Sequence, residues 1–168
     1  MNIFRVVTKY GKALPVFKVH LDGRPSVHMS VESNSQNNNR CVVIVESRKF
    51  VKLWKAEDSQ RALSCGNQNS WRADRKYTRV DQEIFSKPHD DPVFMARVIC
   101  NLPTFACIED GVTRTIWLLA NGCKEFPVEC DVQSSIYLHR AAGVQEYKIF
   151  SVEELYASLS GFPPISCL

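Results

Sequence analysis

The sequence lacks a long apolar run, closely spaced pairs of cysteines and a large excess of either charge. No apolar stretch approaches the roughly 20 residues that a membrane-spanning helix needs, and residues 1–7 lack the basic-then-apolar pattern of a secretory signal peptide. The formal net charge of +3 is too small to require nucleic acid as a partner, although it is compatible with anionic ligands. These absences predict a cytoplasmic protein with no membrane segment.

The cysteines indicate free thiols and give no pattern for a metal site. Seven are present, and none belongs to a Cys-x-x-Cys pair. Cys100 and Cys107 lie within apolar runs, which is typical of buried thiols in a reducing compartment. The absence of ligand spacing argues against a structural zinc site. The full set is Cys41, Cys65, Cys100, Cys107, Cys123, Cys130 and Cys167.

The length of 168 residues and the 45% apolar content predict one α+β domain over residues 1–168. Neither an internal repeat nor a domain linker is visible. Changes in hydrophobic periodicity divide the chain into four consecutive segments. We expect N-terminal strands and a hairpin in 1–46, a helical segment in 47–84, an α/β core in 85–131, and a C-terminal strand and helix in 132–168.

The first half of the chain begins with strand patterns and changes to a helical one. Apolar residues alternate over 17–21 and 27–31 around the turn signal at Asp22-Gly23, which predicts a β-hairpin. Residues 33–39 are polar and predict a loop, and Cys41–Glu46 is a β-branched run typical of a buried strand. From Ser47 the apolar spacing becomes helical, and we expect that helix to run to about Ala62.

The segment Trp71–Arg79 places basic side chains among two aromatic ones. This composition suits contact with a nucleic acid backbone and stacking on its bases. The alternative is a solvated helix face that rests on two core aromatics. The basic residues concerned are Arg72, Arg75, Lys76 and Arg79, and the aromatic residues are Trp71 and Tyr77.

The second half of the chain alternates strands with helices. Val93–Cys100 and residues 105–108 predict strands, and residues 115–120 are apolar on nearly all sides, as in a buried helix. Asn121-Gly122 is a helix stop, because both residues tolerate the left-handed conformation. Residues 126–130 alternate like a strand whose proline, Pro127, predicts an edge or a strand start.

A helix start also appears near the C-terminus. Ser151 with Glu154 matches a capping box. The apolar residues that follow predict an amphipathic helix that ends near Gly161.

The segment Phe105–Trp117 contains the parts of a phosphate site. It predicts a strand, a tight turn at Gly111 and then a buried helix, whose first-turn amides and dipole attract anions. Gly111 permits close approach of the backbone to a ligand, and Thr113 offers a hydroxyl donor. Arg114 can hold the same anion with a bidentate charged clamp.

A structural explanation of the same residues is equally open at this point. In it, Asp110 caps the helix, Gly111 serves the turn and Arg114 pairs with Glu109. Gly-x-x-Arg alone does not distinguish the two explanations.

The unit from Phe105 through Gly111-Val112-Thr113-Arg114 to the Pro127-Val128 strand resembles the ParB/sulfiredoxin superfamily. The Asp110-Gly111 pair, the Arg114…Trp117 spacing and Met95–Val98 upstream are similar to those of plasmid fertility inhibition factors. The match spans about residues 86–131. The resemblance implies a ParB/sulfiredoxin-like fold, with a mixed sheet and a buried helix after the Gly-x-x-Arg turn.

The chain departs from two branches of this superfamily. Sulfiredoxins place their reactive cysteine directly after the motif glycine, where this chain has Val112, so sulfinic acid reduction is not expected. ParB CTPases have Glu-Arg-Arg where this chain has Val-Thr-Arg, which argues against a CTP-gated clamp. Thr113 also replaces the histidine that often precedes the arginine, and this removes an accessible general base.

The resemblance implies hydrolysis of a nucleoside triphosphate such as ATP and cleavage of DNA, used to stop DNA transfer through a conjugation apparatus. Arg114 and the Gly111–Thr113 backbone would bind phosphate and stabilise charge that develops on it. Glu109 and Asp110 would hold a divalent metal such as Mg²⁺ or orient a water. The expected catalytic residues are thus Glu109, Asp110 and Arg114, and the phosphate-binding residues are Gly111, Val112, Thr113, Arg114 and Lys87.

Lys87 begins a polar loop that in this fold could face the same pocket. His89, Asp90 and Asp91 follow it, and a histidine near carboxylates is a possible general base. The alternative is a polar turn before a strand.

Three functions of different class follow from these patterns. The first is a ParB-like ATPase and DNase acting on DNA, either the transferred single strand or the plasmid. The second is an interaction module that blocks a conjugation coupling protein or a relaxase complex by contact. The third is a ParB-like DNA-binding regulator, against which the lack of a helix-turn-helix after the motif counts.

Overall fold

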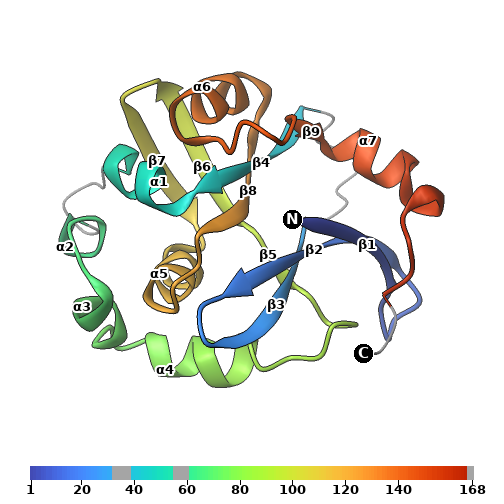
Figure 1. Ribbon diagram of the computed structural model, residues 1–168, viewed down its shortest axis with the longest axis horizontal. Helices are drawn as coiled ribbons and strands as arrows, with labels where there is room; N and C mark the ends of the chain where they lie inside the picture. Colours follow the sequence, from blue (N-terminus) through green and yellow to red (C-terminus); the bar gives the residue numbers. More distant parts are fainter. Residues whose placement is uncertain (32–38, 55–60, 166–168) are drawn as a thin grey trace.

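The computed structural model describes residues 1–31, 39–54 and 61–165, and it is an α+β structure with two mixed sheets (Figure 1). One sheet has the strand order β1-β2-β3-β5, and the other has the order β7-β6-β8-β4-β9. The sequence predicted a single mixed sheet, and the second sheet corrects that prediction. Within the described ranges, no helix is long and apolar enough to span a membrane.

The four-stranded sheet is built mainly from the N-terminal segment. Strands β1 (Asn2–Val7), β2 (Ala13–Leu21) and β3 (Arg24–Ser30) pair in antiparallel order, and β2 and β3 form the predicted hairpin. Strand β5 (Val93–Phe94) adds to β3 in parallel, with Met29 opposite Val93.

The five-stranded sheet contains the predicted central strands. These are β4 (Arg40–Glu46), β6 (Ala96–Leu102), β7 (Phe105–Asp110), β8 (Glu125–Asp131) and the short β9 (Phe150–Ser151). The first of them is confirmed as a buried strand. Of the predicted polar loop 33–39, residues 33–38 lie outside the described residues.

Pro127 lies in a central strand, and the expected edge position is wrong. Strand β8 pairs with β4 on one side, with Ile44 opposite Pro127, and with β6 on the other. Its pairing with β6 begins only at Val128, opposite Ala96. The missing N–H of the proline is tolerated because it lies just before the second ladder starts.

The predicted strand Val93–Cys100 is two strands in different sheets. Strand β5 ends at Phe94 and β6 begins at Ala96, so the chain passes from one sheet to the other at Met95. The Met95 amide still donates to the Ser30 carbonyl at 2.9 Å, which ties the crossing point to β3.

The helical segment after β4 consists of short pieces. They are α1 (Ser47–Leu53), α2 (Arg61–Ser64), α3 (Gln68–Arg72), α4 (Tyr77–Arg79) and the π-helix η1 (Val80–Ile84). Helix α1 ends at Leu53 because Trp54 is extended and forms a bridge to Ala106 of β7. The expectation of one helix to about Ala62 is therefore wrong at its end, and residues 55–60 lie outside the described residues.

The C-terminal segment begins with a helix that the sequence reading missed. Helix α6 (Val132–Ala142) precedes β9, and it is followed by α7 (Val152–Ala157) and the 3-10 turn η2 (Leu159–Gly161). The Ser151 hydroxyl accepts from the Glu154 amide at 3.0 Å, which confirms the predicted start of α7. The prediction of a strand and a helix in 132–168 is thus incomplete, because it lacks α6.

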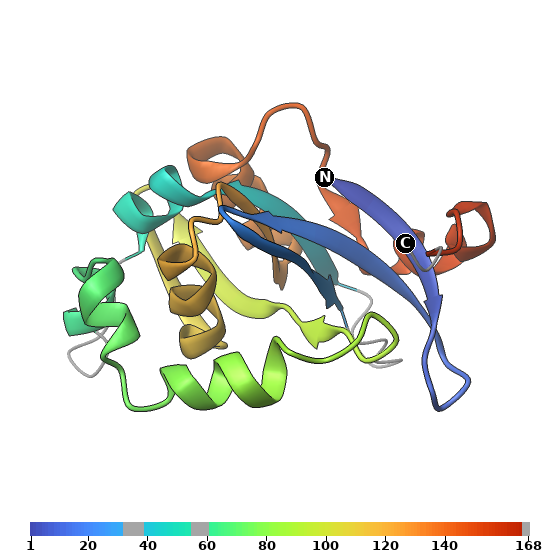
Figure 2. The ribbon, with the colours of Figure 1, turned by 60° about the horizontal axis from the view of Figure 1, so that its bottom comes forward.

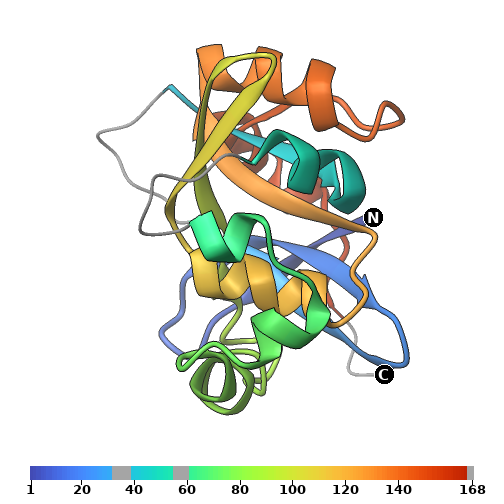
Figure 3. The same cartoon turned by 90° about the vertical axis from the view of Figure 1, so that its left-hand side faces the viewer.

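One hydrophobic core joins the two sheets, and helix α5 (Val112–Ala120) is part of it. Residues 115–120 are buried, and Asn121 with Gly122, at φ +72°, ends the helix as predicted. Figures 2 and 3 show α5 lying between the consecutive helices α4 and η1 on one side and the strands of the five-stranded sheet on the other. Helix α6 covers β4 and β6 from the opposite end of the molecule (Figure 1).

Cys100 is free and buried as the sequence predicted, whereas Cys107 is only half-buried; the other free and buried thiols are Cys41, Cys123 and Cys130. Burial raises the pKa of Cys100 to about 11 and that of Cys123 to about 12. These thiols are therefore held protonated and unreactive at neutral pH.

Candidate functional site

The predicted strand–turn–helix unit is present around Gly111. Strand β7 ends at Asp110, Gly111 adopts the left-handed conformation with φ +90°, and α5 starts at Val112. The Thr115 amide donates to the Gly111 carbonyl at 2.9 Å. No side chain caps this helix start, so the proposed Asp110 cap is wrong.

Gly111 is required by its neighbours as well as by its own backbone angle. A Cβ at this position would lie 2.8 Å from the Ala96 Cα and 3.0 Å from Nη2 of Arg114. The close approach that the sequence assigned to a ligand is made here by the first residue of β6. Gly111 thus fixes the corner that sets the position of Arg114.

The Arg114 side chain is mostly buried, with 17% of it exposed, and it turns towards β5. Its Nη1 donates to the Phe94 carbonyl at 2.6 Å, and its Nη2 forms a salt bridge with Asp110. The structural explanation from the sequence named Glu109 as this partner, and the partner is Asp110 instead. A guanidinium has five N–H donors, so two bonds leave others for an anion.

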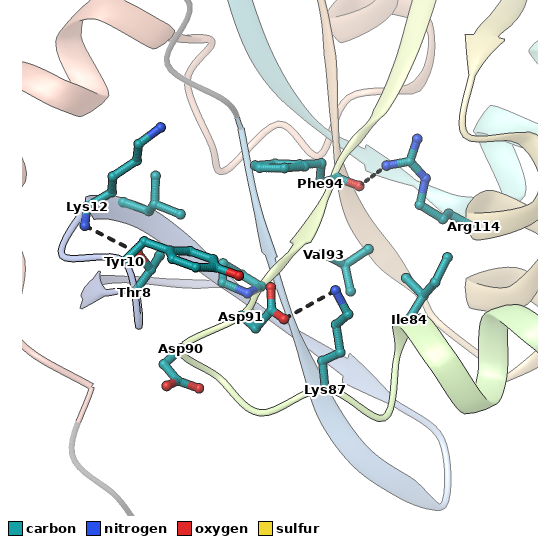
Figure 4. A pocket seen from close by; sticks show the side chains of 12 residues that line it. Thr8, Tyr10, Lys12, Ile84, Lys87, Asp90, Asp91, Val93, Phe94 and Arg114 are labelled. Carbon is teal, nitrogen blue, oxygen red and sulfur yellow. Dashed lines mark hydrogen bonds and ion pairs between the residues drawn. The ribbon is translucent and has the colours of Figure 1, made fainter.

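Arg114 and Lys87 line the same cavity, which has a volume of 470 Å³ (Figure 4). This brings together two of the predicted phosphate-binding residues, from the start of α5 and from the loop after η1. The rest of the lining comes from the β1–β2 turn and the start of β2, from the end of η1, and from the residues before and within β5. They are Thr8, Tyr10, Lys12, Leu14, Ile84, Asp90, Asp91, Pro92, Val93 and Phe94.

Asp91 connects the two sides of this cavity. Its carboxylate lies 3.2 Å from the Lys87 Nζ and 3.5 Å from the Lys9 Nζ. The hydrogen bond from Lys87 is the main cause that holds the pKa of Asp91 below its usual value. His89 lies on the same loop, but its ring packs edge-on against His28, with ring centroids 6.3 Å apart.

Glu109 lies at a different cavity from Arg114. Arg97 of β6 pairs with Asp110 and Val98 pairs with Ile108, so Glu109 is the extra residue of a β-bulge. Its carboxylate is 3.7 Å from Nη1 of Arg97. The Nε of Arg97 in turn lies 3.6 Å from the Glu129 carboxylate. These three side chains line a 330 Å³ cavity together with Arg40, which forms a buried salt bridge with Glu129.

The predicted metal residues are thus directed to different partners, Asp110 to Arg114 and Glu109 to Arg97. In the part of the chain that the structure describes, no three His, Cys, Asp or Glu side chains gather closely enough to hold a metal ion. Magnesium in nucleotide sites commonly uses only one or two carboxylates together with substrate phosphates. Asp110 is 70% exposed beside Arg114 and could offer one such carboxylate, but the carboxylates that line the 470 Å³ cavity itself are Asp90 and Asp91.

The basic segment 72–79 is arranged as the alternative explanation described. Trp71 is buried with its Nε1 donating to the Leu63 carbonyl at 2.8 Å, and the Tyr77 hydroxyl accepts from Asn121. Trp71 is therefore not available to stack on bases, and Tyr77 is half-buried against the core. Arg72 donates to the Ala120 carbonyl and Arg79 pairs with Glu83, while Arg75 and Lys76 are exposed.

Sequence reasoning missed the residues that the β1–β2 turn adds to the cavity, Thr8, Tyr10 and Lys12. No motif marks them, and they reach the site only because β2 and β3 bring the N-terminal hairpin alongside β5. Gly11 was the sequence signal of a tight turn here. In the structure it has φ +76°, and the neighbouring Tyr10 is exposed.

A profile of the family described as Plasmid Fertility inhibition factor matches residues 42–143. The chain belongs to the plasmid fertility inhibition factor family. This fertility inhibition factor is 30% identical over 133 residues to the protein osa of Shigella flexneri. The match covers 77% of this chain and 69% of that protein. The expected resemblance to plasmid fertility inhibition factors is confirmed.

The fold comparison agrees. The structure of this fertility inhibition factor is similar to the crystal structure of the oncogenic suppression activity protein, described as a plasmid fertility inhibition factor, in its gold(I) cyanide derivative. The TM-score is 0.77 at 25% identity, and the match covers 96% of this chain and 85% of that one. Lys87, Arg114 and the β7–α5 corner lie inside the family match, and the β1–β2 turn lies before it.

Proposed function

We propose that this chain is a cytoplasmic fertility inhibition factor that blocks conjugative and T-DNA transfer through a ParB-like ATPase and DNase activity. The observation that supports this most is that Arg114 and Lys87 line one cavity (Figure 4). The ligand is ATP or a phosphate of DNA, either the transferred single strand or the plasmid. The ParB/sulfiredoxin-like fold remains part of the proposal.

Each residue of the proposed site has a role that its surroundings support. Arg114 and Lys87 bind the phosphate, because both line the cavity and both retain donors beyond their present bonds. Gly111, Val112 and Thr113 form the turn that positions Arg114, and the positive end of the α5 dipole adds to the potential there.

Asp110 lies next to the cavity through its salt bridge with Arg114, and there it would share a Mg²⁺ ion with the nucleotide phosphates. The bound metal would neutralise charge on the phosphate. Asp110 also orients the Arg114 guanidinium through their salt bridge. Glu109, engaged with Arg97, acts from outside the cavity by holding the bulge that precedes Asp110.

Arg114→Ala tests this proposal. We expect ATP hydrolysis and DNA cleavage to fall by about 100-fold or more, the loss seen when one preorganised charge-stabilising donor is removed. Conjugation frequency from a donor strain that expresses the variant should rise to the uninhibited value. Arg140→Ala is the matched control, because Arg140 is exposed on α6 and away from the cavity.

The second candidate function is inhibition by contact with a conjugation coupling protein or a relaxase complex. The observation that favours it is a set of exposed large apolar side chains on the β6–β7 turn and α6, namely Leu102, Phe105, Val132 and Ile136. Full inhibition by an Arg114→Ala protein with no hydrolytic activity would support this function and refute the catalytic one.

A further inference from the structure

Two exposed aromatic rings line the cavity that contains Arg114 and Lys87. Tyr10 is 78% exposed and Phe94 is 43% exposed, and both belong to the cavity wall. Figure 4 shows the two rings on the same side of the cavity, with Lys87 and Asp91 below them and Arg114 beyond Phe94. Aromatic side chains bury large apolar areas, so leaving two of them open at one cavity suits them to cover a flat, apolar part of a ligand.

Hydrogen bonds fix the main chain that carries both rings. Tyr10 lies in the tight β1–β2 turn, where the Thr8 amide donates to the Lys12 carbonyl at 2.8 Å and the Gly11 amide donates to the Thr8 carbonyl at 2.8 Å. The Phe94 carbonyl accepts from Arg114, and Phe94 pairs with Ser30 of β3. The main chain at both positions is therefore in place before a ligand binds, and the exposed rings need only adopt suitable side-chain rotamers.

The turn is also tied to the phosphate-binding side. Lys9 has its Nζ 5.2 Å from the centre of the Tyr10 ring and 3.5 Å from the carboxylate of Asp91, which also binds Lys87. This chain of contacts fixes Tyr10 relative to Lys87. The cavity wall thus combines cationic side chains, Lys12, Lys87 and Arg114, with two aromatic rings, and these are the groups that the phosphates and the base of a nucleotide need.

We infer that Tyr10 and Phe94 form the base-binding wall of the site and select an unpaired base. The inference rests on the proposed function, since it assigns the non-phosphate end of the same ligand. A base within a duplex has both faces covered by its neighbours, so only a free nucleotide or an unpaired base in a single strand can stack here. The volume of 470 Å³ lies in the range that holds one ligand of nucleotide size.

Stacking uses the π-face that every base has, so the wall discriminates little between bases. The site therefore accepts purine and pyrimidine nucleotides with similar affinities and prefers single-stranded DNA over duplex DNA. Specificity for one base would need hydrogen-bonding groups aimed at its edge, and the lining offers Thr8 as the one hydroxyl besides Tyr10.

Calorimetric titration with two probes tests the inference. ATP has a base and a triphosphate, whereas inorganic tripolyphosphate has only the anionic part. We expect Tyr10→Ala combined with Phe94→Ala to weaken ATP binding by about 5-fold to 150-fold, the effect of losing one stacked base, and to leave tripolyphosphate binding unchanged. Tyr10→Phe keeps the ring, and it should retain the ATP affinity of the natural chain.

Two comparisons make the outcomes distinct. Phe105→Ala removes an exposed aromatic from the opposite end of β7, and it should change neither affinity. Lys87→Ala should weaken both probes, because it removes the anion contact. Equal losses for both probes in the aromatic variants, or undiminished ATP binding in them, would overturn the stacking wall and leave the phosphate site standing. Failure of the natural chain to bind either probe would overturn the proposed function and the wall with it.

Discussion

Replacement of Gly111 by alanine is the sharpest test of the corner on which the site depends. The residue has φ +90°, a conformation that costs an L-residue about 1–2 kcal/mol. The added Cβ would also lie 2.8 Å from the backbone of Ala96, and overpacking of this kind costs about 1–3 kcal/mol. Alanine restricts the unfolded chain and returns about 0.4–1 kcal/mol. The net expectation for Gly111→Ala is a loss of about 2–4 kcal/mol.

Two other glycines separate the contributions. Gly11 has φ +76° but open space around its Cβ position, so Gly11→Ala should lose only about 1 kcal/mol or less. Gly161 has neither a left-handed φ nor a close neighbour, and Gly161→Ala should be neutral within about 0.5 kcal/mol.

Thermal unfolding followed by circular dichroism gives the measurement. For a chain of this length, about 1 kcal/mol moves Tm by about 2–4 °C, so Gly111→Ala should lower it by about 5–15 °C. Equal shifts for Gly111→Ala and Gly11→Ala would refute the reasoning, because the contact with Ala96 would then add nothing to the backbone cost. The Gly111 variant should also lose ATP binding, since Nη2 of Arg114 lies 3.0 Å from the added atom.

Two further predictions concern titratable groups. Burial lowers the pKa of His28, with His89 and Lys18 adding to the effect, so the folded chain binds its proton less readily than the unfolded one. Stability should therefore fall as pH drops below about 6.5, and His28→Gln should reduce that loss in denaturant titrations at each pH; identical curves would contradict it. Iodoacetamide at neutral pH should label exposed Cys65 in the folded chain, whereas Cys123, whose pKa is raised from 9.0 to about 12, has about 1,000-fold less thiolate than an ordinary cysteine. Mass spectrometry that finds Cys123 modified as fast as Cys65 would show that it is not buried.

Elements with a strong local signal were predictable from the sequence. The β2–β3 hairpin follows from alternation around Asp22-Gly23, and α5 follows from an apolar run bounded by Gly111 and by Asn121. At these positions the backbone preference and the burial pattern point to the same structure, so a single sequence suffices.

Helix α6 shows why other elements were missed. Its buried face consists of Ser134, Ser135, Leu138 and Ala142, which gives almost no hydrophobic periodicity. The two serines are accommodated by hydrogen bonds, such as that from the Cys100 amide to the Ser134 hydroxyl at 3.0 Å. The one available signal was Asp131, whose side chain accepts from the Ser134 amide as an N-cap.

At the candidate site, the features that the sequence did not predict are set by tertiary contacts. An apolar run such as Val93–Cys100 has the same composition whether it forms one strand or changes sheets at Met95. Likewise, only the bulge in β7 separates Glu109 from Asp110, and a bulge is fixed by pairing with β6. The contribution of Tyr10 depends on the packing of a hairpin about 80 residues earlier in the chain than Phe94, which no local pattern encodes.

The crossing at Met95 has a consequence for how this site can diversify. Lys87 and Arg114 come from within the stretch 42–143 that the family profile matches, while the turn that carries Tyr10 and Lys12 lies before it in the chain. Changes in the length or composition of that turn would alter which molecules fit without disturbing Arg114 or its corner. The part of the cavity wall formed by that turn and the part formed by Arg114 and its corner can therefore change independently of each other.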